Sequence, residues 1–330
     1  NIGNIFRVVT NDDFNTTSRK VSVSDYVPAP ISLMNTRRIG GTANQVTVPT
    51  GVTPSRGERD RPTDLLGAAK FTGAIGDLRY GLLGAFEDDV KWFGQNELGE
   101  AVNIEDQGRD FAVTRLLYES VGRDKRSIGY LGTLASGPRY DAIVHGIDGH
   151  YTSSNANLIF DAQLVMSDVD NLQGYGGMLD LLYASSNNLR HKFELDYMNE
   201  KVNFSDLGFL RRNDYASARY VMSYEKQKFS ESVTNFRTTV VLEKQQNVTK
   251  QQSISSGIYW RASMILPGRN SLRTAVAYFP RRFEAIDSRG NGAYKVDEGG
   301  WVNLNIATDA ASVTSYSASI GAVTENQGDW

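Results

Sequence analysis

Alternation of apolar and polar residues dominates the chain from Leu65 onward. In the segment 192–197, for example, Phe193, Leu195 and Tyr197 alternate with charged residues. A period of two is typical of β-strands, whose successive side chains point to opposite faces of a sheet. The i, i+3, i+4 pattern of an amphipathic helix persists in no window, so we predict an all-β fold with antiparallel strands.

Turn-forming clusters of Gly, Asn, Asp and Ser separate the alternating segments. We predict strands within residues 65–72, 78–87, 111–121, 127–135, 142–151, 157–167, 179–183, 192–197, 218–225, 236–243, 258–266, 272–278 and 301–308. Further short strands would bring the total to roughly 14 or more. Residues 1–63 hold five of the eight prolines, which disfavour interior strands, so we predict an irregular segment there that forms the first strands or a plug. Residues 64–330 are predicted to form the antiparallel sheet.

Ionised side chains occupy one face of these segments even at mid-strand. A charge buried without a partner in a dry core costs several kcal/mol, whereas a charge that faces water costs little. The other face is apolar, and the long alternating runs suit a membrane-spanning strand of about 9–11 residues. We therefore predict a transmembrane β-barrel with an apolar exterior and a polar lumen. The residues predicted to face the lumen are Lys70, Arg79, Arg115, Asp161, Asp180, Glu194, Asp196, Arg219, Arg237, Glu243, Arg261 and Arg273.

A soluble protein remains an open alternative, because a one-sided antiparallel sheet with its polar face in solvent has the same alternation. Such a chain would be a β-rich carbohydrate-binding module or a carbohydrate-active enzyme. A third alternative is a structural barrel that conducts nothing.

Composition narrows the chemistry. The 330 residues contain no Cys, which excludes disulfides, thiolate metal sites and a cysteine nucleophile. The net charge of −3 gives no basic face for nucleic acid, and the three His have no metal-ligand spacing. No apolar run is long enough for a transmembrane helix, and no signal peptide is visible at the start.

No group of residues assembles into a catalytic site. Glu194 and Asp196 share a strand face at a spacing that a glycosidase would permit, but such pairs are common on polar faces. The loop Asp287–Glu298 has calcium-loop spacing, yet Arg289 stands where an oxygen ligand is needed. We therefore predict no enzymatic activity, no cofactor and no metal.

One cluster between two alternating segments carries a family resemblance. It comprises Phe204, Leu207, Gly208, Phe209, Arg212 and Asp214, in the pattern F-x-x-L-G-F-x-x-R-x-D. The stretches Thr36–Gly41, Gly67–Phe86 and Phe111–Leu134 agree in the same order. Together they resemble a bacterial outer-membrane β-barrel domain of unknown function, which usually follows a carbohydrate-binding family 9-like domain.

The resemblance implies an outer-membrane location in a Gram-negative bacterium and contact with outer-membrane lipid. It also implies solute passage or binding, or docking of a surface lipoprotein or another membrane-complex subunit, with carbohydrate as a further candidate partner. The carbohydrate-binding family 9-like domain, a β-sandwich, is absent from this sequence, and no apolar closing strand ends the chain. We therefore expect a fragment of a longer protein. We interpret the cluster Phe204–Asp214 as a structural latch, in which Arg211, Arg212 and Asp214 pair with each other or with lumen charges.

Overall fold

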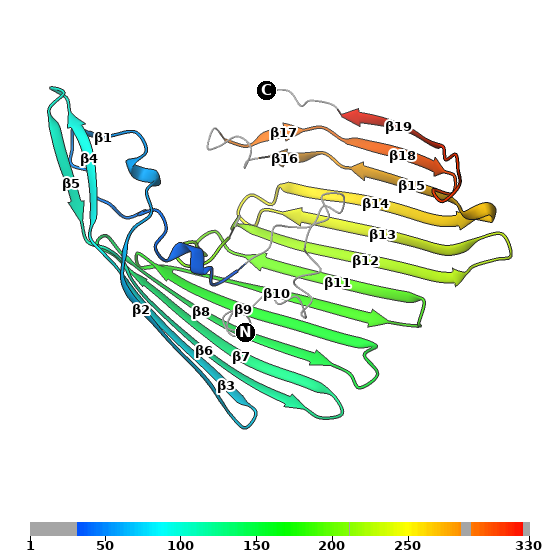
Figure 1. The fold of residues 1–330 in the computed structure, drawn as a ribbon, viewed down its shortest axis with the longest axis horizontal. Coiled ribbons are helices and arrows are strands. Elements are labelled where there is room, and N and C mark those ends of the chain that lie inside the picture. The colour runs from blue at the N-terminus through cyan, green and yellow to red at the C-terminus, as the bar shows by residue number, and fades with distance from the viewer. Residues whose placement is uncertain (1–31, 211, 285–291, 326–330) are drawn as a thin grey trace. The chain divides into compact units, whose positions relative to one another are not determined.

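The computed structural model describes residues 32–210, 212–284 and 292–325, and β-strands dominate it (Figure 1). Its main strands are β2 (Leu65–Ile75), β3 (Leu78–Glu87), β6 (Asp110–Val121), β7 (Lys125–Ser136), β8 (Asp141–Thr152), β9 (Leu158–Val169), β10 (Leu172–Ala184), β11 (Leu189–Met198), β12 (Tyr215–Lys228), β13 (Thr234–Gln246), β14 (Ser253–Leu266), β15 (Asn270–Phe279), β18 (Gly299–Ala307) and β19 (Ser317–Glu325). These 14 strands form one sheet in the order β2-β3-β6-β7-β8-β9-β10-β11-β12-β13-β14-β15-β18-β19. The prediction of an all-β, antiparallel architecture is confirmed.

Two small sheets accompany the main one. The first has the order β1-β4-β5 and comprises β1 (Val52–Pro54), β4 (Val90–Asn96) and β5 (Ala101–Asp106). The second pairs β16 (Arg282–Glu284) with β17 (Tyr294–Val296). The short turns η3 (Thr36–Arg38), η4 (Glu58–Asp60) and η5 (Pro267–Arg269) are 3-10 helices. In the described part of the chain, no helix has the length and apolarity needed to cross a membrane.

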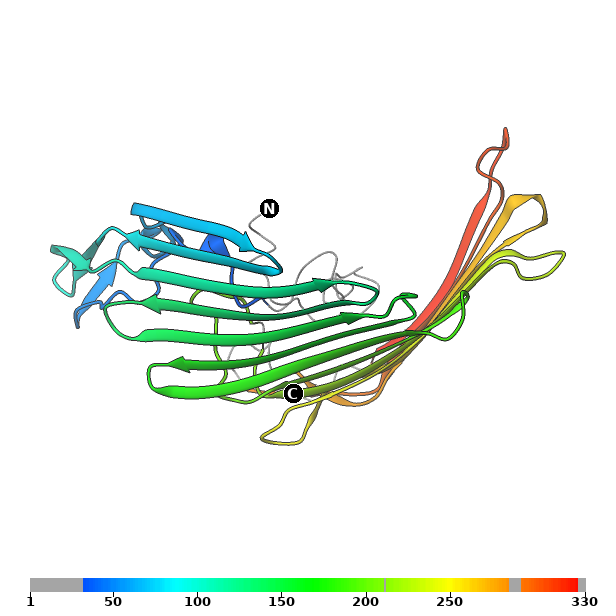
Figure 2. The ribbon, with the colours of Figure 1, turned by 90° about the horizontal axis from the view of Figure 1, so that it is seen from below.

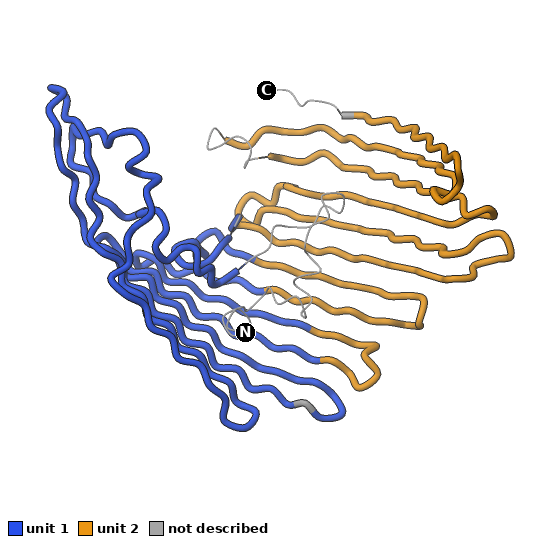
Figure 3. Tube along the Cα trace, in the orientation of Figure 1, with its two compact units in different colours: residues 1–151, 161–177, 198–213 blue, residues 152–160, 178–197, 214–330 orange. Residues whose placement is uncertain are grey.

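The chain divides into two compact units (Figure 3). Unit 1 contains the described residues up to Tyr151, together with Asp161–Gly177 and Met198–Asn213. Unit 2 contains Thr152–Phe160, Met178–Tyr197 and the described residues from Asp214 onward.

Unit 1 has one exposed apolar face. Strands β2, β3, β6 and β7 run side by side (Figure 2), and their register places Ile75, Leu78, Tyr118 and Ile128 in one cross-strand row. All four side chains are exposed, with Ile128 at 59%. The opposite face of β6 carries Phe111, Val113, Arg115 and Leu117, which are buried.

Unit 2 repeats this arrangement. The register of β13, β14, β15 and β18 aligns Val240, Trp260, Val276 and Val302, of which the last three are exposed large apolar side chains. On the other face, Arg219 of β12 lies opposite Glu243 of β13, and both side chains are buried. Each unit thus exposes an apolar face and buries ionic groups on the other.

The hairpin β4–β5 was not predicted. Trp92 of β4 is buried with Val90 and Ile104 in a separate small core. The neighbouring Asp88 and Asp89 are exposed. Residues 287–291 of the calcium-like loop lie outside the described residues.

Candidate functional site

The predicted lumen residues of unit 1 lie on the face opposite the exposed apolar row. The register aligns Lys70 with Leu83 and sets Arg79 opposite Leu117, so both share the face of Arg115. Arg79 forms an ion pair with Glu119 at 2.9 Å. Asp161 of β9 pairs with His150 of β8.

The side chain of Arg115 in β6 reaches across β7 to form an ion pair with β8. Its guanidinium makes a two-pronged contact with Asp148 of β8, with 2.8 Å between Nη2 and Oδ2. The strand between them contributes Gly129, and a Cβ at that position would collide with the guanidinium. A glycine is therefore needed at position 129 to make room for this buried ion pair.

Unit 2 contains a denser buried network. Arg219 Nη1 lies 3.0 Å from Glu194 Oε2, and Arg219 Nε lies 3.8 Å from Glu243 Oε2. Lys192 Nζ contacts the other oxygen of Glu194 at 2.6 Å, while Ser255 donates a hydrogen bond to Glu243 Oε1. These charged side chains are at most 12% exposed, so the network is shielded from solvent.

The remaining predicted residues of unit 2 differ in burial. Asp180 and Asp196 are buried, at 2% and 6% exposure. Arg237 forms an exposed ion pair with Glu225. The register places Arg261 opposite Thr239 and Arg273 opposite Ser263, on the face of Arg219. Within each unit, the predicted lumen residues therefore lie on the polar face of the described strands. That this face encloses water remains a prediction.

The latch (residues 204–214) packs against the chain near Leu33. Phe204 and Leu207 are buried, whereas Phe209 is 37% exposed. A Cβ on Gly208 would collide with the carbonyl oxygens of Ser32 and Phe204. Close packing, rather than an unusual backbone dihedral, therefore calls for glycine at this position.

Asp214 has a different role from the predicted pairing with arginines. It accepts hydrogen bonds from the backbone N–H groups of Val248 and Thr249, from the Thr249 hydroxyl, and from Asn247 Nδ2. These contacts close the turn between β13 and β14. Arg212 is half-buried, and Arg211 lies outside the described residues.

A second irregular segment, the strap (residues 32–48), pairs with the latch. Ser32 and Phe209 exchange two backbone hydrogen bonds, at 3.1 and 2.6 Å. Asn35 N–H donates to the carbonyl of Leu207, and Arg38 Nε donates to that of Gly208. The strap and latch residues 207–209, about 170 residues apart in sequence, thus form one structural element in unit 1.

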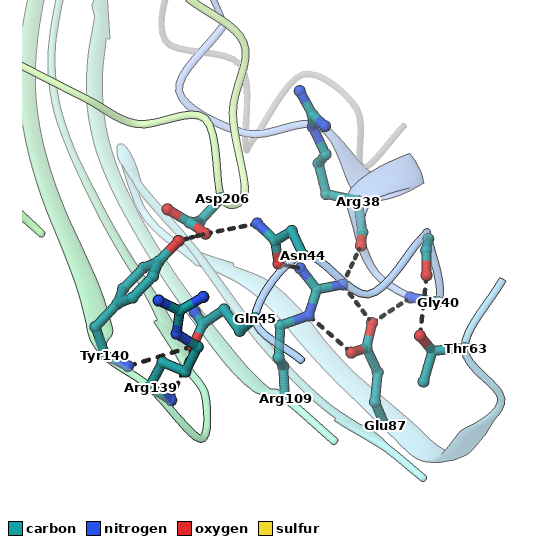
Figure 4. Close-up of polar contacts among 11 residues, drawn as sticks. Arg38, Gly40, Asn44, Gln45, Thr63, Glu87, Arg109, Arg139, Tyr140 and Asp206 are labelled. Carbon is teal, nitrogen blue, oxygen red and sulfur yellow. Dashed lines mark hydrogen bonds and ion pairs between the residues drawn. The ribbon is translucent and has the colours of Figure 1, made fainter. Parts of the chain in front are cut away.

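Arg109 is the centre of the polar contacts that hold the strap (Figure 4). Its Nε and Nη2 atoms each lie 2.9 Å from an oxygen of Glu87, and the side chains of this ion pair are 5% and 1% exposed. The same guanidinium donates to Asn44 Oδ1 and to the carbonyl of Arg38. Glu87 also accepts from the N–H of Gly40. One buried ion pair of the sheet therefore binds three positions of the strap.

Asp206 links the strap, the latch and the turn before β8. Its Oδ1 accepts hydrogen bonds from Asn44 Nδ2 and from the Tyr140 hydroxyl, both at 3.1 Å. Gln45 Oε1 accepts from the backbone N–H groups of Arg139 and Tyr140 (Figure 4). Burial and the Asp206 carboxylate raise the pKa of Tyr140 from 10.0 to about 12.

The raised pKa of Tyr140 gives a pH prediction. The folded protein holds this phenolic proton more tightly than the unfolded chain, so the stabilisation is complete below about pH 10 and is lost between about pH 10 and 12. We expect the absorbance difference at 295 nm between wild type and Y140F to titrate near pH 12 in the folded protein. A difference titration centred near pH 10 would contradict the contact with Asp206.

These strap contacts were missed in the sequence interpretation. Arg109 lies just before a predicted strand, and Asn44, Gln45 and Tyr140 lie in irregular segments without periodicity. The available signal was the motif Thr36–Gly41, which marks the strap itself. Within the described residues, no group of three or more His, Cys, Asp or Glu side chains could hold a metal ion.

Comparison with known proteins assigns a family. A family described as "Domain of unknown function (DUF5916)" matches residues 31–329. No curated protein and no solved structure gave a match. Since the match spans nearly the whole sequence, the chain belongs to the DUF5916 family.

Proposed function

We propose that the chain forms the wall of an integral outer-membrane β-barrel in a Gram-negative bacterium, for passage or binding of polar solutes. The observation that carries the proposal is the inverted distribution of side chains. Rows such as Ile75, Leu78, Tyr118 and Ile128 are exposed on one face, while Arg115 on the other face is 2% exposed.

Water does not favour such an arrangement, because contiguous exposed apolar surface is uncommon in soluble monomers. In lipid, acyl chains would solvate the apolar face, and closure of the sheet would satisfy the backbone groups of β2 and β19, which are the end strands of the described sheet. Most of the main strands have 10–14 residues, which suffices to span a hydrocarbon core at a tilt.

The ionic face gives the proposed passage its chemistry. Groups such as Lys70 and Arg273 are exposed there, while Arg115 and Glu194 are paired. A hydrated face with charges of both signs lowers the barrier for polar solutes and sets selectivity among them. Docking of a surface lipoprotein, or a wall that conducts nothing, would use the same lipid-facing surface. Single-channel recording of the reconstituted protein in planar lipid bilayers separates these roles, because conductance is expected only of a passage.

Substitution of Leu82 tests which face meets lipid. Leu82 is 46% exposed at the middle of β3. In lipid, L82R should lower the free energy of unfolding by about 2–4 kcal/mol, and less of the protein should fold into vesicles. In water the same change on an exposed position should be nearly neutral. Urea unfolding in lipid vesicles, followed by tryptophan fluorescence, measures the difference.

Thr72 provides the matched control. It lies opposite Gly81 on the ionic face, which already carries Lys70 and Arg79. T72R should change the unfolding free energy by less than about 1 kcal/mol. Equal effects of L82R and T72R, together with a monodisperse protein in buffer without detergent, would favour a soluble carbohydrate-binding module or enzyme instead.

A further inference from the structure

We propose that the β12–β13 hairpin of unit 2 binds the anionic headgroup of a membrane lipid through Lys226 and Lys228. This inference rests on the proposed function, because it takes the exposed apolar face to be the one that meets lipid. It adds the class of lipid and the place at which the headgroup binds.

The apolar face of this hairpin changes character toward its turn. Its successive cross-strand rows are Met222–Val240, Tyr224–Thr238, Lys226–Phe236 and Lys228–Thr234. All four rows share one face, because every second residue of a strand points to the same side and residues directly opposite one another do so too. The face therefore passes from aliphatic to aromatic to cationic side chains between the first row and the last.

Three aromatic rings lie beside the lysines. Phe236 is directly opposite Lys226, and its ring centroid lies 4.6 Å from that of Phe229 and 6.2 Å from that of Tyr224. Phe229 follows Lys228 in sequence and is 48% exposed. Aromatic side chains are enriched where acyl chains give way to headgroups, and the long stems of lysines reach from apolar surface to that level. The hairpin thus carries both kinds of residue expected at this depth.

The lysines leave positive charge uncompensated on this face. Both are exposed, and neither has an ion-pair partner in the part of the chain that the structure describes. On the opposite face of the same hairpin, Arg237 is paired with Glu225 at 2.8 Å. Glu231 lies in the turn between the two strands and not in one of the four rows. An anion from outside the chain is therefore the group that this surface complements.

The spacing of the two lysines suits a phosphate group. Alternate residues of a strand lie about 7 Å apart, and lysine is a point charge with three donors on a flexible stem. Both ammonium groups can therefore approach one phosphate, while the acyl chains of the same lipid lie along Met222, Val240 and Trp260, which is aligned with Val240. A free phosphate ion lacks this second contact, so the surface favours a lipid.

A fluorescent label at position 230 reports which lipids contact the hairpin. Ser230 is exposed in the turn, and the chain has no Cys, so S230C provides a single labelling site. The labelled protein is placed in neutral detergent micelles and titrated with phosphatidylglycerol or with phosphatidylcholine. Both lipids carry a nitroxide on the acyl chain next to the headgroup, so quenching of the label measures the affinity of each lipid for this place.

We expect phosphatidylglycerol to bind roughly tenfold or more tightly than phosphatidylcholine, since each lysine near an anionic lipid contributes roughly fivefold. K226Q/K228Q should bring the two affinities within about twofold of each other. These substitutions are at exposed positions, so the fold should tolerate them. High salt should reduce the preference in the unsubstituted hairpin, because it screens exposed charges.

Lys250 provides the matched control. It is exposed in the turn between β13 and β14, at the other end of β13 from the proposed site. K226Q and K250Q each remove one positive charge, but only K226Q should weaken the preference for phosphatidylglycerol, by roughly fivefold. Equal effects of the two substitutions would overturn the proposal, because the net charge of the protein would then determine the preference.

The quenching data separate failure of this inference from failure of the proposed function. Equal quenching by the two lipids would show that the hairpin meets lipid and would overturn only the headgroup site. A preference for phosphatidylglycerol that survives K226Q/K228Q would overturn the role of the lysines. Quenching by neither lipid would overturn the site and would also contradict the assignment of the apolar face of unit 2 to lipid.

Discussion

Replacement of Arg109 by methionine should lower the free energy of unfolding by about 3–5 kcal/mol, because it leaves a buried carboxylate without its partner. Glu87 has a side-chain exposure of 1% and receives both of its strong contacts from Arg109. Desolvation penalises the isolated anion, and only the N–H of Gly40 remains to bind it. The measurement is urea unfolding in detergent micelles or lipid vesicles.

Loss of the guanidinium also weakens the strap. Asn44 and the carbonyl of Arg38 lose their donor, so R109M should increase proteolysis within residues 32–48 as well as reduce global stability. The double variant R109M/E87L should recover part of the lost stability, since removal of both charges removes the desolvation penalty. It should not restore protection of the strap, because the donor to Asn44 is still absent.

The exposed pair Arg237–Glu225 serves as the control for Arg109. Its side chains are 63% and 53% exposed, and such surface pairs contribute about 0–1 kcal/mol. R237M should therefore change stability much less than R109M. Similar effects of the two substitutions would mean that Arg109 is solvated in the folded protein and does not hold the strap.

The strands were predictable because alternation is a local property. Each of the predicted segments overlaps a strand of the main sheet. The assignment of Lys70 and Arg79 to the same face followed from the alternation of apolar and polar residues alone. The cross-strand register then keeps apolar and ionic residues on separate faces of the sheet, since residues directly opposite one another share a face.

The strap and its contacts were not predictable in the same way. Arg38 and Gly208 are separated by 170 positions, and their hydrogen bond depends on packing that no periodic pattern encodes. Short strands such as β4, with Lys91 and Gly94 among its seven residues, also carry too weak an alternation to be recognised. The latch motif did indicate a packed turn, but only the tertiary structure identifies the strap as the segment that packs against it.

Arg219 is the corresponding residue in unit 2, and R219M should also lower the unfolding free energy by about 3–5 kcal/mol. The guanidinium lies between Glu194 and Glu243, whose side chains are 2% and 9% exposed. Its removal leaves Lys192 as the remaining cation paired with Glu194 in this network. Two buried carboxylates then repel each other in a region of low polarity, where the interaction is poorly screened.

A second substitution separates repulsion from loss of packing. If charge imbalance is the main cause, R219M/E243Q should be more stable than R219M, because one of the two carboxylates has become neutral. Glutamine keeps an oxygen that can accept from Ser255 Oγ, so this contact need not be lost. Equal stability of R219M and R219M/E243Q would instead assign the loss to the missing side-chain volume and hydrogen bonds. In that case the ionic face of unit 2 would be hydrated enough to tolerate its excess negative charge.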